Sequence, residues 1–257
     1  ISKTFNPGTV NEKCALHDLS LSVPDGDFVT IIGANGAGKS TLFGAIGGNF
    51  LTDSGEVLLD GQNVTFWPEH RRSKVIGRLF QDPMRGTAGN MMIEENLAMA
   101  SRRGQKLGLS WSSKPEQTEK FREMLKELDL GLEERMTAHV GLLSGGQRQA
   151  LTLLMATLVR PQLLLLDEHT AALDPKTAAK VLELTDRLVT TQKLTTLMIT
   201  HIMRDALRYG NRLVMMHAGR IVVDVKGDEK KHLTVPDLLA LFEKGAGEVS
   251  DAMMLSS

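Results

Sequence analysis

The sequence predicts an α/β fold with a parallel sheet, an antiparallel β subdomain near the N-terminus and an inserted α-helical subdomain. Two apolar runs, residues 28–32 and 163–166, are typical of parallel strands that are buried on both faces. Residues 83–159 instead show helical spacing of their apolar positions and no clear strand. We therefore expect one domain over residues 1–257. Its α/β core would be formed by residues 1–82 and 160–257, and its helical subdomain by residues 83–159.

Turn signals delimit the remaining strands and helices. Residues 2–23 alternate polar and apolar positions, which predicts two strands joined by a turn. Residues 55–64 predict a hairpin that turns at Asp60 and Gly61, and residues 212–225 predict a final hairpin. A short amphipathic helix is expected over residues 235–244, followed by a frayed end.

Composition excludes several classes of protein. Charged residues make up 24% of the chain and the net charge is −1, so no broad basic surface for nucleic acid is expected. The single cysteine, Cys14, excludes an internal disulfide and fits a reducing compartment; its simplest interpretation is a small buried apolar residue. No apolar run is long enough to cross a bilayer, and the N-terminus shows no secretory signal.

A glycine-rich stretch, GANGAGKST, directly follows the first apolar run. Its spacing, G-x-x-x-x-G-K-S, is that of the Walker A phosphate loop. The glycines allow the backbone to wrap closely around an anion, and the amides at the start of the next helix point at phosphates. Lys39 adds a charge for the β- and γ-phosphates, and the Ser40 hydroxyl can ligate Mg²⁺. The predicted nucleotide-binding residues are Gly33, Ala34, Asn35, Gly36, Ala37, Gly38, Lys39, Ser40 and Thr41.

Carboxylates end the second apolar run, where ligands bind in parallel sheets. Asp167 is placed to hold the Mg²⁺ shell, and Glu168 to polarise an attacking water. His201 ends a further predicted strand, residues 195–200, and is expected on the same sheet edge as Lys39 and Glu168. A histidine at this position has a functional and a structural interpretation of about equal weight.

Two further features have both a structural and a functional interpretation. Ser144, Gly145, Gly146 and Gln147 precede a predicted helix, and such a start can bind an anion or can simply cap the helix. Phe5 is the one upstream aromatic residue that could stack on an adenine ring, or it could pack within the sheet.

The order of the motifs resembles that of the nucleotide-binding subunit of ABC transporters, and the resemblance covers nearly the whole chain. In sequence order these motifs are Phe5, GANGAGKST, Gln81, LSGGQ, LLLLDE, AALD and His201. The LSGGQ element distinguishes this family from other phosphate-loop NTPases. The resemblance implies the ABC ATPase fold and Mg²⁺-dependent ATP hydrolysis that drives transport. By motif position, Phe5 resembles the adenine-stacking aromatic residue, and Gln81 resembles the residue that joins Mg²⁺ and water to the helical subdomain. Glu168 resembles the general base. Asp174 resembles the dimer-contact aspartate, and His201 resembles the γ-phosphate switch. His169 stands where many members have Pro, Ala or Asn, and no role is assigned to it.

The resemblance also implies partners. A second copy, or a similar subunit, would form a head-to-tail dimer that encloses two ATPs, with Ser144 of one subunit facing the γ-phosphate held by the other. The chain would lie on the cytoplasmic face of the membrane against permease subunits. Met84, Met91 and Met92 would line a groove for a short helix of the permease, although methionines in a core explain the pattern equally well.

Three types of system remain open. The first is an importer of a small solute: the polar insertion over residues 101–114 is similar to that of branched-chain amino-acid uptake ATPases. The stretch FQDPMRGTAGNMMIEENLAMA, with LLSGGQRQALTLLMA and LLLLDEHTAALDPKTA, resembles a bacterial branch associated with lipoprotein-type binding proteins for amino acids, including aromatic ones. The second type is an exporter or a lipoprotein-release system. The third is an ABC ATPase that acts on DNA or ribosomes; such proteins usually carry two ATPase halves, a coiled coil or zinc-binding cysteines, which this sequence lacks.

Overall fold

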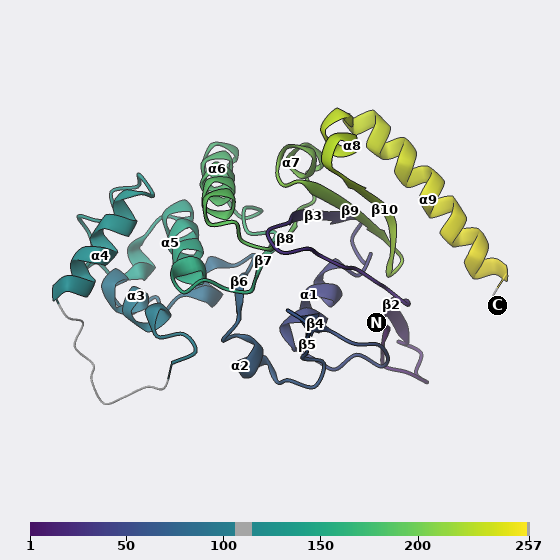
Figure 1. The fold of residues 1–257 in the computed structure, drawn as a ribbon, viewed down its shortest axis with the longest axis horizontal. Helices are drawn as coiled ribbons and strands as arrows, with labels where there is room; N and C mark the ends of the chain where they lie inside the picture. The colour runs from purple at the N-terminus through teal and green to yellow at the C-terminus, as the bar shows by residue number, and fades with distance from the viewer. Residues whose placement is uncertain (106–114, 256–257) are drawn as a thin grey trace. The chain divides into compact units, whose positions relative to one another are not determined.

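A computed structural model describes residues 1–105 and 115–255 (Figure 1). Most of the predicted polar insertion at 101–114 therefore lies outside the described residues. The chain divides into two compact units, one formed by Ile1–Arg72 with Lys193–Ser257 and the other by Ser73–Gln192. Residues 83–159, predicted as a helical subdomain, lie within the second unit.

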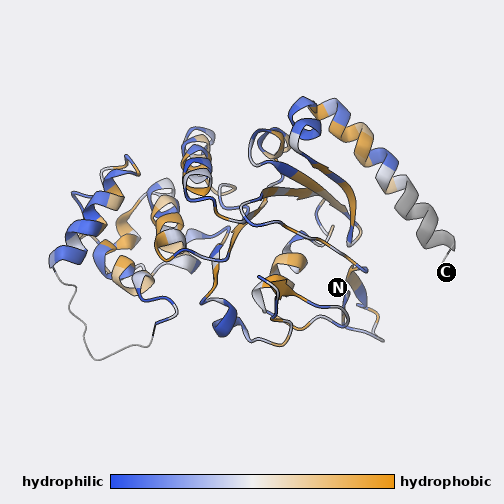
Figure 2. Ribbon diagram, viewed as in Figure 1, coloured by the Kyte–Doolittle hydropathy of each residue, from blue (hydrophilic) through white to orange (hydrophobic). Residues whose placement is uncertain are grey.

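A four-stranded, mostly parallel sheet forms the centre of the first unit. Strand β3 (Phe28–Gly33) lies between β8 (Thr196–Ile199) and β9 (Arg212–His217) and is parallel to both. Strand β10 (Arg220–Lys226) continues the sheet as an antiparallel neighbour of β9, as Figure 1 shows. Most residues of these strands are hydrophobic, as Figure 2 shows. This composition suits a sheet that helices cover, because its side chains are buried away from water.

Two small antiparallel pairs accompany this sheet. Strand β1 (Lys3–Phe5) pairs with β2 (Lys13–Leu16), and β4 (Leu58–Leu59) pairs with β5 (Gln62–Asn63). Asp60 and Gly61 have positive φ angles of 49° and 74°, so the predicted tight turn is confirmed.

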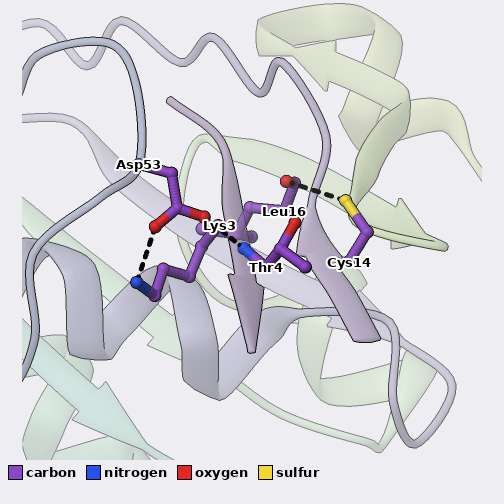
Figure 3. A network of polar contacts seen from close by, with 5 residues as sticks. All are labelled: Lys3, Thr4, Cys14, Leu16 and Asp53. Carbon is purple, nitrogen blue, oxygen red and sulfur yellow. Dashed lines mark hydrogen bonds and ion pairs between the residues drawn. The ribbon is translucent and has the colours of Figure 1, made fainter. Parts of the chain in front are cut away.

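Cys14 corrects one expectation from the sequence. It lies in β2 but is exposed, and its Sγ lies 3.4 Å from the carbonyl oxygen of Leu16 (Figure 3). A ribbon of two strands is too narrow to bury both faces, so a small apolar residue on it need not lie in a core.

Helix α1 (Lys39–Gly47) follows β3, and α2 (Glu69–Arg72) ends the first segment of the unit. The Arg72 side chain is buried, with 1% of its area exposed. Its guanidinium donates to the carbonyl oxygens of Ala45 and Ile46 at 2.6 and 2.8 Å, and to those of Thr65 and Trp67 at 2.7 and 3.0 Å. Arg72 thereby donates hydrogen bonds to carbonyl oxygens in the last turn of α1, which have no amide donor within their own helix.

The last segment of the first unit is more helical than the sequence predicts. It contains α7 (Met203–Arg208), α8 (Gly227–His232) and α9 (Val235–Leu255), and α9 replaces the expected frayed end. Leu238 is fully buried, and Phe242 makes an edge-to-face contact with His217 at a centroid distance of 5.4 Å. At Gly245 a Cβ would lie 2.7 Å from the carbonyl oxygen of Val222, so α9 packs closely on β10 beyond residue 244. This packing extends the helix.

The second unit combines a parallel strand pair with helices. Strand β6 (Ile76–Leu79) pairs with β7 (Leu163–Asp167), from Ile76 opposite Leu163 to Leu79 opposite Leu166. The unit also contains the 3₁₀ turns η1 (Pro83–Gly86) and η2 (Val140–Leu142), and the helices α3 (Ile93–Ser101), α4 (Pro115–Lys126), α5 (Gly145–Leu158) and α6 (Pro175–Gln192).

Helix α4 illustrates how the helical part is packed. Its surface is mostly hydrophilic in Figure 2, but Phe121 and Leu125 are buried together with Leu128, which follows the helix. Their spacing, at positions i, i+4 and i+7, is that of one apolar face of a helix.

Candidate nucleotide-binding site

The phosphate loop joins the end of β3 to the start of α1. Gly38 is the residue before the helix and has a φ angle of 101°, and a Cβ on it would lie 2.5 Å from the carbonyl oxygen of Ala15. Only glycine fits both constraints. No side chain caps this end of α1, so its first amides remain available to an anion.

Lys39 lies within the loop that precedes it. Its side chain is 6% exposed, and its Nζ donates to the carbonyl oxygens of Gly33 at 2.7 Å and Ala34 at 3.2 Å. Ala34, Asn35, Gly36 and Ser40 are exposed. The ammonium thus holds the loop in shape while the outer backbone of the loop remains accessible.

His201 lies at the same sheet edge as the loop. Ile199 pairs with Ile31, and the amide of Thr200 donates to the carbonyl oxygen of Ile31 at 3.1 Å. Because Gly33 and His201 each follow this pair by two residues on parallel strands, both stand where the sheet ends. His201 is exposed there.

The predicted adenine-stacking residue lies on the β1–β2 ribbon. The Phe5 ring contacts Phe50 edge to face at a centroid distance of 5.3 Å. Strand β1 is held by Asp53, whose carboxylate accepts from the Thr4 amide at 2.6 Å and from Lys3 Nζ at 2.7 Å (Figure 3). These two hydrogen bonds, followed by the charge of Lys3, lower the pKa of Asp53. Phe5 therefore stands on an anchored strand.

In the second unit, the predicted polar residues gather where β6 and β7 end. Gln81 and Glu168 each lie two residues beyond the last pair, Leu79 and Leu166, and Asp167 is the final residue of β7. Glu168 has a φ angle of 46°, an uncommon conformation for a residue with a side chain, and its carbonyl oxygen accepts from the Ala171 amide at 2.9 Å. The chain turns sharply at this carboxylate.

An arginine that sequence reasoning missed lies beside the predicted metal ligand. Arg78 on β6 forms an ion pair with Asp167 on β7, with 3.6 Å between Nη2 and Oδ2. The Asp167 side chain is 19% exposed, so its carboxylate remains partly open to solvent. The guanidinium of Arg78 also lies 4.8 Å from the centroid of the Phe80 ring. No sequence motif marked Arg78, because only the register of the two strands brings it to Asp167.

His169, which had no assigned role, is buried directly after Glu168. Its Nε2 lies 3.2 Å from Thr185 Oγ1, and the Thr185 hydroxyl in turn donates to the carbonyl oxygen of Val181 at 2.8 Å. The hydroxyl oxygen is thus left as an acceptor, which assigns the hydrogen to Nε2. Burial lowers the pKa of His169 to about 4, so the imidazole is neutral at pH 7. It ties the end of β7 to α6.

The LSGGQ residues form a complete helix cap. The amide of Gln147 donates to Ser144 Oγ at 3.3 Å, the amide of Ser144 donates to Gln147 Oε1 at 3.2 Å, and Gln147 Nε2 reaches the carbonyl oxygen of Leu130. A Cβ at Gly146 would collide with Thr177 and one at Gly145 would lie 3.0 Å from Leu173. The two glycines therefore allow α5 to approach the chain at the start of α6.

Asp174 caps α6 in the same manner. Its Oδ1 accepts from the amide of Thr177 at 3.1 Å, and hydrogen bonds from Thr177 lower the pKa of the carboxyl. The carboxylate is exposed, so the cap leaves it accessible.

The predicted metal ligands carry oxygen donors of the type that Mg²⁺ prefers. Among residues 1–105 and 115–255, no group of three or more His, Cys, Asp or Glu side chains could hold a metal by itself. The Ser40 hydroxyl, the Gln81 amide oxygen and the Asp167 carboxylate are nevertheless hard oxygen donors. Mg²⁺ in nucleotide sites typically takes one or two such protein ligands and completes its shell with phosphates and water.

Comparison with known proteins identifies the family. Residues 16–171 match the sequence profile of the family described as ABC transporter. The chain belongs to the ABC transporter family. It is 44% identical over 243 residues to the tyrosine transport ATP-binding protein of Clostridioides difficile (strain R20291). This alignment covers 95% of this chain and 96% of that protein. It is 36% identical to the longer methionine import ATP-binding protein MetN of Corynebacterium jeikeium (strain K411), which covers 86% of this chain and 58% of that one.

Solved ABC structures share the fold. A dimeric ATP-binding cassette in a post-hydrolysis state, bound to ADP and phosphate, is 28% identical, with a TM-score of 0.74 over 88% of this chain and 96% of that one. An ABC transporter cassette in its ADP conformation is 28% identical, with a TM-score of 0.76 over 94% of this chain and 95% of that one. The predicted ABC ATPase fold is confirmed, and the chain is an ATP-binding subunit with ATPase activity. Within the described ranges, no helix is both long and apolar enough to span a bilayer.

Proposed function

We propose that this ABC ATPase energises the uptake of an amino acid, with tyrosine as the first candidate. The observation that carries the proposal is the 44% identity to a tyrosine transport ATP-binding protein, which extends over nearly the full length of both chains. Methionine import ATPases support the same class of solute, but the chain spans only 58% of the MetN protein.

Uptake of radiolabelled tyrosine by cells that lack the gene tests this proposal. Wild-type protein supplied from a plasmid should restore uptake, whereas the Lys39→Ala variant should not. Unlabelled methionine and leucine, added as competitors, define the specificity. Normal tyrosine uptake in the deletion strain would refute tyrosine as the solute, and a loss of methionine uptake alone would move the assignment to methionine.

Each half of the predicted site has a proposed role in the ATPase cycle. The residues from Gly33 to Thr41 hold the phosphates through backbone amides and Lys39, and Phe5 stacks on the adenine. His201 contacts the γ-phosphate from the sheet edge that it shares with the loop. Glu168, at the sharp turn that follows β7, accepts a proton from the attacking water.

Ser40, Gln81 and Asp167 would hold the Mg²⁺ that accompanies ATP. When bound, Mg²⁺ would neutralise charge on the phosphates. Arg78 lies 3.6 Å from Asp167, so this ion pair would hold the carboxylate at the end of β7, where the metal is proposed to bind.

We also infer the assembly. The working form is a head-to-tail dimer, in which Ser144, Gly145, Gly146, Gln147 and Asp174 of one subunit face the nucleotide of the other. Two of the matched structures, including the post-hydrolysis cassette, are described as dimeric, which supports a dimer. The dimer would lie on the cytoplasmic face of the membrane, bound to permease subunits that work with a solute-binding protein or lipoprotein. Met84, which lies in η1 and is 46% exposed, fits the permease-facing surface.

Purification of the tagged chain from its native membranes, with mass spectrometry of the bound proteins, tests the partners. A multi-span permease and a solute-binding lipoprotein are expected. A partner with a large extracytoplasmic domain and no binding protein would instead identify an exporter or a lipoprotein-release system. Ribosomal or DNA-repair proteins would refute the transport function.

A further inference from the structure

A second lysine lies against the phosphate loop, in addition to Lys39. A methyl group placed on Gly36 would lie 3.5 Å from Nζ of Lys13, the first residue of β2. Two residues further along the same strand, the carbonyl oxygen of Ala15 makes the close approach to Gly38 described above. Strand β2 therefore runs alongside the loop, and two separate contacts define this placement.

The strand pairing sets the direction in which Lys13 projects. Lys13 is directly opposite Phe5 in the antiparallel β1–β2 pair, so the two side chains lie on the same face of the ribbon. The ammonium group thus lies beside the loop proposed for the phosphates, on the ribbon face that also carries the aromatic ring proposed for adenine. A nucleotide that contacts both would pass beside it.

The charge of Lys13 is not neutralised by the protein. Lys13 is exposed, and within residues 1–105 and 115–255 its side chain takes part in no hydrogen bond or ion pair. Lys3, on the neighbouring strand, differs because Asp53 holds its ammonium at 2.7 Å. The adjacent carboxylate of Glu12 accepts from the Gly8 amide at 2.7 Å. An unpaired cation beside an anion-binding loop attracts negative ligands.

We propose that Lys13 is a second phosphate-binding residue of the nucleotide site, which contacts the phosphate chain of both ATP and ADP from the β1–β2 ribbon. This inference rests on the proposed function, in which the loop from Gly33 to Thr41 binds the nucleotide. An ammonium on a flexible stem reaches a phosphate without fixed geometry, so either nucleotide satisfies it. Adenosine, which carries no phosphate, does not interact with it.

Calorimetric titration of the full chain with ATP, ADP and adenosine, without added Mg²⁺, tests the proposal. Lys13→Ala should weaken ATP and ADP binding by about three- to fivefold, the upper part of the range expected for one exposed charge contact, and should leave adenosine binding unchanged. Lys13→Arg should restore the affinity, because it retains the charge. Lys226→Ala removes another exposed lysine, at the end of β10, and is the matched control.

The outcomes separate this proposal from the one on which it rests. Nucleotide affinities of Lys13→Ala within about twofold of wild type, while wild type binds normally, would overturn the role of Lys13 alone. Equal losses for ATP, ADP and adenosine would also overturn it, since they would indicate damage to the ribbon and not a lost phosphate contact. Failure of the wild type to bind ATP or ADP would overturn the nucleotide site itself and this inference with it.

Discussion

Acidification should destabilise the protein through His169, and substitution of this residue should remove the effect. The imidazole is 2% exposed and has a pKa of about 4 in the folded chain, compared with 6.5 when it is solvated. Between these two values the unfolded chain binds a proton that the folded chain does not. The free energy of unfolding therefore falls as the pH falls through this window, and is unaffected by His169 at higher pH.

The size of the effect follows from the two pKa values. Because each pKa unit corresponds to 1.36 kcal/mol, the loss should be about 2 kcal/mol at pH 5 and about 3 kcal/mol at pH 4. Urea unfolding in metal-free buffer at pH 7.5, 6 and 5, followed by circular dichroism, measures it. His169→Gln retains an amide donor for Thr185 and cannot titrate, so its stability should fall less over the same range.

The difference in pH dependence between wild type and His169→Gln isolates the effect of His169, since the two proteins share all other titrating groups. The difference in unfolding free energy between wild type and His169→Gln should shrink or reverse by about 2 kcal/mol from pH 7.5 to pH 5. Parallel pH dependences for the two proteins would refute the reasoning, because they would mean that His169 is solvated or charged in the folded chain.

Three further predictions concern the ATPase and the first unit. Glu168→Gln should retain ATP binding, reduce turnover at least about 100-fold and trap a dimer with Mg-ATP; a monomer by light scattering would contradict the proposed assembly. Lys39→Ala should raise the Kd for ATP by at least about tenfold, and unchanged affinity in a calorimetric titration would remove its phosphate role. Arg72→Met leaves four carbonyl oxygens without their donor and should cost about 3 kcal/mol of stability or more, whereas Arg71→Met on the neighbouring exposed residue should cost at most about 1 kcal/mol. Equal unfolding midpoints for these two variants would be incompatible with the capping role of Arg72.

Much of the fold could be predicted because its signals are local. The apolar runs that became β3 and β7 and the turn residues of the hairpins each lie within a few positions of one another. The short helices α7 and α8 were missed, since six residues show too little of a helical period. The end of α9 was mispredicted because its packing against β10 depends on a strand that no local pattern connects to it.

The residues of the candidate site could also be predicted wherever a motif lies within one short stretch of the chain. Motif spacing indicated the phosphate loop, Glu168 and His201, and the structure places each of them at the carboxyl end of a strand. The LSGGQ cap and the Asp174 cap were also visible as helix starts. None of the surrounding charges was foreseen.

By itself, the sequence determined the chemistry available to this protein: a nucleotide-binding loop, a carboxylate pair after a buried strand and the ABC motifs. These depend on residue types at fixed spacing along one stretch of chain. Only the tertiary structure decided which groups meet them: Lys13 at Gly36, Arg78 at Asp167 and Thr185 at His169. The reason is that strand register and helix packing set these distances, and hydrogen bonds and ion pairs act over only a few ångströms.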